Sequence, residues 1–181
     1  MNTKRMLLDA FYELMHEREF DDITVQMILD RSHLSRGTFY RYYTDKYDLM
    51  NSFYRIHVDD MLQQVGKTID ISDAFEQVFQ HLQSNKNYYR RVLKTEGMES
   101  FLGFLEQYSY DFYRAKLEET VGTESIDSEA SIRIEMFCAG HIAALKKWVE
   151  RGCLESPKQM AHLCLEFIPE DLQGAGLHVS A

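Results

Sequence analysis

ITVQMILDRSHLSRGTFYRYYTDKYDLM, residues 23–50, is the segment from which the fold of this chain is best predicted. Thr24 favours the N-terminal cap of a helix, and the apolar residues after it follow a helical period. Residues 33–35 interrupt that helix, and residues 36–42 form a second, shorter one. A third helix begins at Lys46. Two helices joined by a short turn are typical of a helix-turn-helix, whose second helix enters the major groove of DNA.

The second of these helices has residue types that suit contact with DNA. Its first residues would face the base edges, where Arg36 can bond to guanine bidentately and Thr38 can touch a thymine methyl group. Gly37 has no side chain, so the helix can approach the groove closely. Lys46 and the backbone N–H groups at the start of its helix suit a phosphate. The residues predicted to contact DNA are Thr24, Ser35, Arg36, Gly37, Thr38, Tyr40, Arg41, Tyr42 and Lys46.

An ordinary helical bundle is the alternative interpretation of this segment. Phe39 and Tyr43 are four residues apart and share one helical face, so we expect them to be buried under either interpretation. In an ordinary bundle, an exposed helix start with the sequence Ser-Arg-Gly-Thr at residues 35–38 would have no function. This difference favours the DNA-binding interpretation.

The same residues carry a resemblance to a known family. Residues 23–50 are similar to the N-terminal domain of the tetracycline-repressor (TetR) family, through Ile-Thr-Val, Ser-Arg-Gly-Thr-Phe-Tyr-Arg-Tyr-Tyr and Asp-Lys-Tyr-Asp-Leu. The family usually has Gly in the turn where this chain has His33, and Ala where it has Ser32. A left-handed backbone is easiest for Gly, although His adopts it more readily than most residues. The resemblance implies a three-helix DNA-binding domain, followed by a larger helical domain for ligand binding and dimerisation.

Few helix-breaking residues occur in the chain as a whole. Its 181 residues include two prolines and nine glycines, and the apolar positions recur with the period of a helix. We therefore predict an all-α protein of about nine helices. The DNA-binding domain would comprise residues 1–46, and the regulatory and dimerisation domain residues 47–181. A long helix from Lys46 to about Gln64 would belong to both.

The net charge of −9 at first opposes DNA binding, but the distribution of charge matters more than its sum. Residues 31–46 carry four basic side chains and one acidic side chain. The three cysteines lack a CxxC spacing, and we expect them to be reduced packing residues of a cytoplasmic protein. No apolar run is long enough to span a membrane. We expect no metal, no cofactor and no enzymatic activity, because no titratable pair stands at a catalytic spacing.

Small residues near the C-terminal end suggest how the chain dimerises. Residues 137–157 are similar to the C-terminal domain of a Gram-positive-type subgroup of the same family, which implies a dimerising pair of helices here. Small side chains let two helices approach closely across a two-fold axis, although they can also pack within one protomer. The predicted interface residues are Ala139, Gly140, Ala143, Ala144, Met160 and Leu163.

Aromatic residues of the central helices can line an apolar pocket or belong to the core. The candidates for ligand contact are Tyr54, His57, Phe75, Phe79, Tyr89, Phe101, Phe104 and Tyr108. With such a pocket, the chain would be a homodimeric repressor that a small-molecule effector releases from operator DNA. The alternative is an activator or co-regulator of the same fold that a protein partner controls.

Overall fold

The computed structural model describes residues 2–97, 99–122 and 126–173, and every named element in these ranges is a helix. A small N-terminal domain contains α1 (Thr3–Glu17), the 3-10 turn η1 (Phe20–Asp22), α2 (Val25–Ser32) and α3 (Arg36–Tyr42). The later helices are α4 (Lys46–Gln63), α5 (Ile71–Ser84), α6 (Lys86–Val92), α7 (Phe101–Val121), α8 (Ser128–Glu150), α9 (Pro157–Leu165) and α10 (Glu170–Gln173). The prediction of an all-α fold is confirmed.

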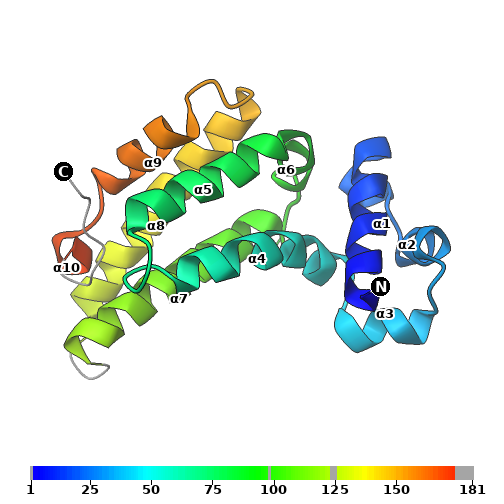
Figure 1. Ribbon diagram of the computed structural model, residues 1–181, viewed down its shortest axis with the longest axis horizontal. Coiled ribbons are helices and arrows are strands. Elements are labelled where there is room, and N and C mark those ends of the chain that lie inside the picture. The colour runs from blue at the N-terminus through cyan, green and yellow to red at the C-terminus, as the bar shows by residue number, and fades with distance from the viewer. Residues whose placement is uncertain (1, 98, 123–125, 174–181) are drawn as a thin grey trace.

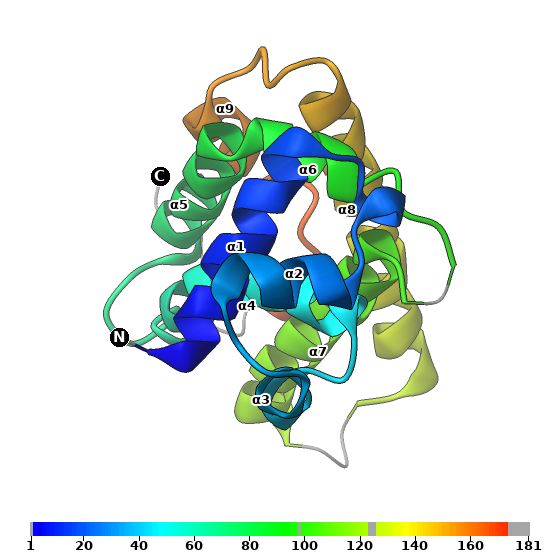
Figure 2. The ribbon, with the colours of Figure 1, turned by 90° about the vertical axis from the view of Figure 1, so that its right-hand side faces the viewer.

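The helix α4 joins the small domain to the larger one (Figure 1). Its N-terminal end lies beside α1, and α5 and α7 pack against the rest of it. In the larger domain, α8 packs on α7 and α9 packs on α5. Figure 2 looks along the molecule from the small domain, with α1, α2 and α3 in front. None of the described helices is long and apolar enough to cross a membrane.

Side-chain caps define the ends of the helices that form the helix-turn-helix. Thr24 accepts a hydrogen bond from the Met27 N–H (3.3 Å) and starts α2, and Ser35 accepts one from the Thr38 N–H (3.2 Å) and starts α3. Between them, His33 has φ 56° and ψ 34°. This is the left-handed conformation that usually calls for glycine. The turn therefore keeps its expected geometry with histidine in that place.

Aromatic residues fill the core of both parts. Phe11 and Phe20 are buried in the small domain and meet edge to face at 6.3 Å. In the larger domain, the buried Trp148 meets Phe79 edge to face at 5.4 Å. One hydrophobic cluster includes both sites, so the core continues from one domain to the other. Full burial of one such side chain contributes roughly 1.5–3 kcal/mol to the stability of the folded state.

Candidate DNA-binding surface and effector cavity

Two aromatic side chains fix α3 to the small domain. Phe39 and Tyr43 are almost completely buried, as predicted, and their ring centroids lie 5.9 Å apart. At the start of the helix, the Ser35 hydroxyl lies 2.9 Å from the Thr38 hydroxyl, within hydrogen-bond distance. These contacts hold the inner side of α3, while the start of the helix and its outer side stay exposed.

The outer side of α3 carries most of the side chains predicted to contact DNA. Those exposed to solvent are Thr24, Ser35, Arg36, Gly37, Tyr40, Arg41 and Tyr42, while Thr38 is half-buried. The Arg36 guanidinium lies 5.7 Å from the centroid of the Tyr40 ring. This cation–π contact orients Arg36 across the surface of the helix without burying its donors. The guanidinium is therefore available to a partner that approaches α3.

Packing within the protein does not explain why residue 37 is glycine. A Cβ atom built on it would meet nothing within 4 Å, and its φ is not in the left-handed region. Neither crowding within the protomer nor backbone conformation therefore requires glycine at this position. A surface that approaches α3 from outside would supply the reason, and a DNA groove is such a surface.

The substitution Gly37→Ala is expected to separate DNA affinity from stability. Alanine inside a helix is more stable than glycine by about 0.5–1 kcal/mol, so the urea midpoint of unfolding should rise. The added methyl group would stand between α3 and the groove, and overpacking of a fitted contact costs about 1–3 kcal/mol. Fluorescence anisotropy with a selected duplex measures the affinity. A variant that binds DNA as tightly as the wild type would contradict close approach at this residue.

Lys46 is held inside the small domain, in contrast to its predicted contact with a phosphate. Its ammonium group donates to the carbonyl oxygens of Phe20 and Ile23 at 3.0 Å each, and to that of Asp21 at 3.5 Å. It also lies 4.3 Å from the centroid of the Phe20 ring. Burial lowers the pKa of Lys46, although Asp21 and Asp22 act in the opposite direction. Three carbonyls thus give Lys46 a structural role, which is to tie the start of α4 to η1.

The backbone at the start of α4 is also occupied by groups of the protein itself. The Asp45 carboxylate accepts hydrogen bonds from the N–H groups of Tyr47 and Asp48, each at 2.8 Å. Asp48 in turn accepts one from the Thr44 N–H at 3.0 Å. Carboxylates therefore take the place predicted for a DNA phosphate at this helix end.

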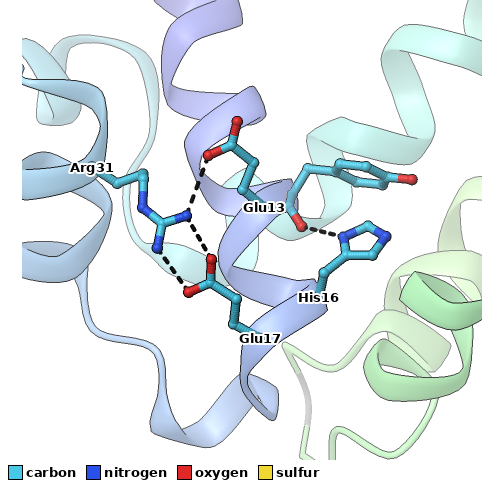
Figure 3. Close-up of polar contacts among 5 residues, drawn as sticks. Glu13, His16, Glu17 and Arg31 are labelled. Atoms are coloured by element: carbon cyan, nitrogen blue, oxygen red, sulfur yellow. Dashed lines mark hydrogen bonds and ion pairs between the residues drawn. The ribbon is translucent and has the colours of Figure 1, made fainter.

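A second basic residue, Arg31, is held within the small domain (Figure 3). Its guanidinium donates to both carboxylate oxygens of Glu17, at 2.9 and 2.7 Å, and to Glu13 at 3.2 Å. The hydrogen bond from Arg31 lowers the pKa of Glu17 and joins α2 to α1. Of the four basic residues between 31 and 46, Arg36 and Arg41 remain exposed on α3. The positive surface is therefore smaller than the count of basic residues predicts.

The first turn of α1 adds a basic residue to this side of the molecule. The Lys4 ammonium lies 5.8 Å from the centroid of the Tyr43 ring, at the end of α3. Figure 1 shows the N-terminal end of α1 beside α3. The first turn of α1 contains no acidic residue. Lys4 is visible in the sequence, but only the fold brings its ammonium to the end of α3.

A partly open cavity lies between α4, α5, α7 and α8. Its volume is about 50 Å³, room for water but well below the roughly 300–1,000 Å³ of ligand pockets. The cavity is lined by Tyr54, Leu62, Phe75, Val78, Phe79, Leu105, Tyr108, Ser109, Phe112, Tyr113, His141, Ile142 and Leu145. Half of the residues predicted for ligand contact are among them, namely Tyr54, Phe75, Phe79 and Tyr108.

The other four residues predicted for ligand contact do not line the cavity. Phe101 and Phe104 pack against Tyr54, with ring centroids 5.8 and 5.9 Å from it. His57 and Tyr89 both pack against the His81 ring, with centroids 4.5 and 5.7 Å from it. Helical periodicity identifies a residue as inward-facing, but it does not decide whether that residue faces the cavity or the packed core.

The wall of the cavity is uncharged. The Phe137 carbonyl lies 2.9 Å from Nδ1 of His141, and a carbonyl can only accept, so Nδ1 carries the proton. Burial lowers the pKa of His141 to about 4, which keeps the ring neutral at pH 7 and leaves Nε2 as an acceptor. Hydroxyls of Ser109 and Tyr113 are further polar groups of the wall. An ionised ligand would lose its hydration here without gaining a counter-charge, so the wall suits uncharged molecules.

A row of small and apolar residues is exposed along α8. Ala139, Gly140, Ala143 and Ala144 are exposed, and Met136, one turn before them, is 71% exposed. A Cβ atom on Gly140 would meet nothing within 4 Å, so packing within the protomer does not require glycine there. Exposed apolar residues at helical spacing are typical of a surface that packs against another helix.

The α9 residues predicted for the interface differ in their exposure. Leu163 is 46% exposed, whereas Met160 is 5% exposed and buried within the protomer. Met160 belongs to the core because α9 packs along α5. Its side chain is therefore not accessible to a second protomer. Ile132 on α8 and Phe167 beyond the end of α9 are exposed. They add apolar surface that was not predicted.

Two family models match this chain. Residues 7–53 match the model described as bacterial regulatory proteins, tetR family, and residues 70–170 match that described as transcriptional regulator C-terminal region. The second match alone covers more than half of the chain. A curated relative, the uncharacterized HTH-type transcriptional regulator YxbF of Bacillus subtilis (strain 168), is 30% identical over 74 residues. That match covers 41% of this chain and only 18% of the relative's length.

Solved structures have the same architecture. The dihydroxyacetone kinase operon activator DhaS aligns with a TM-score of 0.63 and 16% identity, over 91% of this chain and 92% of that one. A TetR transcriptional regulator from Streptococcus agalactiae 2603V aligns with a TM-score of 0.61 and 20% identity, over 93% and 94%. The fatty acid degradation regulator FadR from Bacillus halodurans aligns with a TM-score of 0.56 and 16% identity, over 91% and 93%. At these identities the likeness establishes a common fold.

One family model matches the N-terminal part of the chain and the other matches the C-terminal part. The fold shared with the solved structures extends over nearly the whole chain. This chain therefore belongs to the TetR family of bacterial transcriptional regulators.

Proposed function

We propose that the chain acts in the cytoplasm as a homodimeric regulator that binds operator DNA in a sequence-specific manner. The observation that carries this proposal is the exposed start of α3, where the uncrowded Gly37 stands beside Arg36. The test is a selection of binding sites from random duplexes, which should yield one site with two related halves. A protein that enriches no sequence would contradict specific recognition.

The homodimer is proposed to form through α8, with α9 beside it. Two copies of the row from Met136 to Ala144 would pack across a two-fold axis, where small residues let the helices come close. The two copies of α3 should then lie about 34–36 Å apart, the separation of successive major grooves on one side of DNA.

A charge placed in this row should prevent the dimer. Ala143→Glu would bury an unpaired carboxylate in the contact, which costs about 2–5 kcal/mol for each buried charge. Light scattering is expected to give the mass of a dimer for the wild type and that of a monomer for the variant. Gln77→Glu places the same charge on the exposed side of α5 and should leave the dimer intact. A monomeric wild type at micromolar concentration would refute the dimer.

The proposed mode of control is release of a repressor by a small effector in the cavity. The uncharged wall and the free acceptor of His141 favour an uncharged, mainly apolar molecule that can donate one hydrogen bond. The cavity of about 50 Å³ would have to widen to hold it. The effector would therefore stabilise a second conformation, which is the condition for releasing DNA.

An activator or co-regulator controlled by a protein partner is the second candidate. The small volume of the cavity favours it, because a partner-controlled regulator needs no ligand site. The structural relative DhaS is an operon activator by its own description.

Reciprocity distinguishes the two modes of control. Candidate uncharged aromatic compounds are first screened for a rise in melting temperature, which a bound ligand produces by mass action. A compound found in this way is then titrated with and without operator DNA. Typical coupling of about 1–3 kcal/mol predicts that the operator weakens effector binding by the corresponding factor. Equal affinities would count against release by an effector and favour control by a protein.

A further inference from the structure

A hydrogen bond between side chains joins the DNA-binding domain to the corner between α5 and α6. The Tyr12 hydroxyl on α1 lies 2.9 Å from Oδ1 of Asn85, which is 73 residues away in the chain. The Tyr12 ring also stacks on Phe53 of α4, with centroids 4.9 Å apart and planes 13° from parallel. Tyr12 is half-buried, so its ring and its hydroxyl make separate contacts with the larger domain.

The direction of each hydrogen bond at Asn85 is fixed by its neighbours. Nδ2 of Asn85 lies 2.9 Å from the His81 carbonyl, which can only accept, so this atom is the amide nitrogen. Its oxygen therefore faces Tyr12, whose hydroxyl must donate. The same nitrogen lies 3.4 Å from Nδ1 of His81, which accepts. The proton of that ring is then on Nε2, 2.7 Å from the Tyr89 hydroxyl oxygen.

The surroundings of His81 keep this pattern in place. Burial, and after it the neighbouring His57, lowers the pKa of His81 to about 4, so the ring stays neutral and Nδ1 keeps its lone pair. The two imidazole rings stack with centroids 4.5 Å apart. Tyr89 packs edge to face against Tyr54, which lines the cavity. The contacts thus continue from α1 to the cavity wall.

The side chain of Asn85 bonds to Tyr12 and does not cap the helix that follows it. It occupies the N-cap position of α6, where an asparagine side chain usually accepts from the first turn of the helix. Here its side chain makes no capping hydrogen bond, and its oxygen accepts from Tyr12 instead. Nearby, Arg91 of α6 donates to the carbonyls of Arg18 and His16 at the end of α1. The end of α1 is therefore held by α6, and its middle by Asn85.

From these contacts we propose that Tyr12 is a positioning residue whose hydroxyl, held by Asn85, fixes the orientation of the DNA-binding domain relative to the larger domain. Tyr12→Phe removes the hydroxyl and keeps the ring on Phe53, so both domains stay folded while their relative orientation becomes looser. In a dimer, two loosened α3 helices would meet two half-sites together less well, although each would still fit one half-site.

The first experiment measures orientation within one protomer. Spin labels are attached to cysteines introduced at Gln26 on α2 and Gln77 on α5, both exposed, while the native cysteines are buried. Labelled chains are diluted with unlabelled ones, and double electron–electron resonance gives the distribution of distances. Tyr12→Phe should broaden this distribution. Tyr110→Phe is the matched control, because that hydroxyl bonds to Arg114 within α7.

A second variant keeps the inference testable if Tyr12→Phe is poorly folded, as judged by its urea midpoint. Asn85→Ala removes the same hydrogen bond from the other side and should broaden the distribution in the same way. The double variant should be no broader than Asn85→Ala alone, because both substitutions remove the hydrogen bond between Tyr12 and Asn85. Distributions as narrow as that of the Tyr110→Phe control would overturn the proposal.

The second experiment measures the consequence for DNA and rests on the proposed dimeric function. Kd is measured on a full site and on a duplex with one half-site scrambled. Tyr12→Phe should weaken full-site binding by about 2- to 12-fold, the range given by one net hydrogen bond. Half-site binding should not change. Equal loss on both duplexes, or no loss on either, would overturn the positioning role. A wild type without preference for the full site would instead contradict the dimer, and the distance distribution then decides the present proposal.

Discussion

Replacing Arg36 with alanine is expected to weaken binding to the selected operator by about 1–3 kcal/mol, or roughly 5- to 150-fold in Kd. The Arg36 guanidinium is exposed at the start of α3, and its contact with the Tyr40 ring holds it there with its donors free. Two donors in a fixed plane match the O6 and N7 atoms of guanine. The loss should therefore be large on the operator and should relax the preference for one base pair.

Arg41→Ala is the matched control for this result. Arg41 is the same residue type, exposed near the end of α3, and it is expected to contact a phosphate. Its removal should weaken binding to all sequences and lower the salt dependence by about one unit per half-site. Binding of both variants is measured by anisotropy on the operator and on each of its single-base variants. If Arg41→Ala changed base preference while Arg36→Ala did not, the two roles would have to be exchanged.

The second large effect is expected on stability, from Lys46→Met. Methionine keeps an unbranched apolar side chain but removes the ammonium group, so the carbonyls of Phe20 and Ile23 lose their donor. Hydrogen bonds to charged groups contribute about 1.5–3 kcal/mol. We expect a loss of that size in the free energy of unfolding, measured in urea.

Lys4→Met provides the comparison for Lys46→Met. It is the same change of residue in the same domain, at a position that is also half-buried. The Lys4 ammonium has a cation–π contact with Tyr43, worth about 0.5–1 kcal/mol, in place of hydrogen bonds to three carbonyls, so the loss of stability should be smaller. Lys4→Met should instead weaken DNA binding and reduce its salt dependence. If Lys46→Met left stability unchanged and reduced the salt dependence, its ammonium would leave the three carbonyls and reach a phosphate when DNA binds.

The helix-turn-helix could be predicted because its signals are local in the chain. Ser35 caps the helix that follows it directly, and His33 adopts a turn conformation set by its own backbone. The burial of Phe39 and Tyr43 follows from their spacing along one helix. Each of these features depends on residues within about one turn of helix, so one sequence is enough to find them.

The functions assigned to single residues were less predictable because they depend on distant partners. The carbonyls that bind Lys46 come from residues 20–23, which only the folded domain brings to α4. Met160 and Leu163 are three residues apart on α9, yet the packing of α5 buries one and leaves the other exposed. Phe101 and Phe104 likewise face Tyr54 rather than the cavity. Periodicity finds the buried faces of helices but not the neighbour that each face meets.

The internal binding of Arg31 and Lys46 also affects how the protein would be distributed over a chromosome. Attraction to arbitrary DNA comes mainly from phosphates neutralised by basic residues. Of the four basic residues between positions 31 and 46, only Arg36 and Arg41 are exposed, on a chain of net charge −9. A genome offers roughly 10⁶–10⁹ competing sites, and weak attraction to each leaves more molecules free. A small number of copies per cell would then be enough to fill the operator. Such a regulator would depend on the fit at Gly37 and the base contact of Arg36 to stay there.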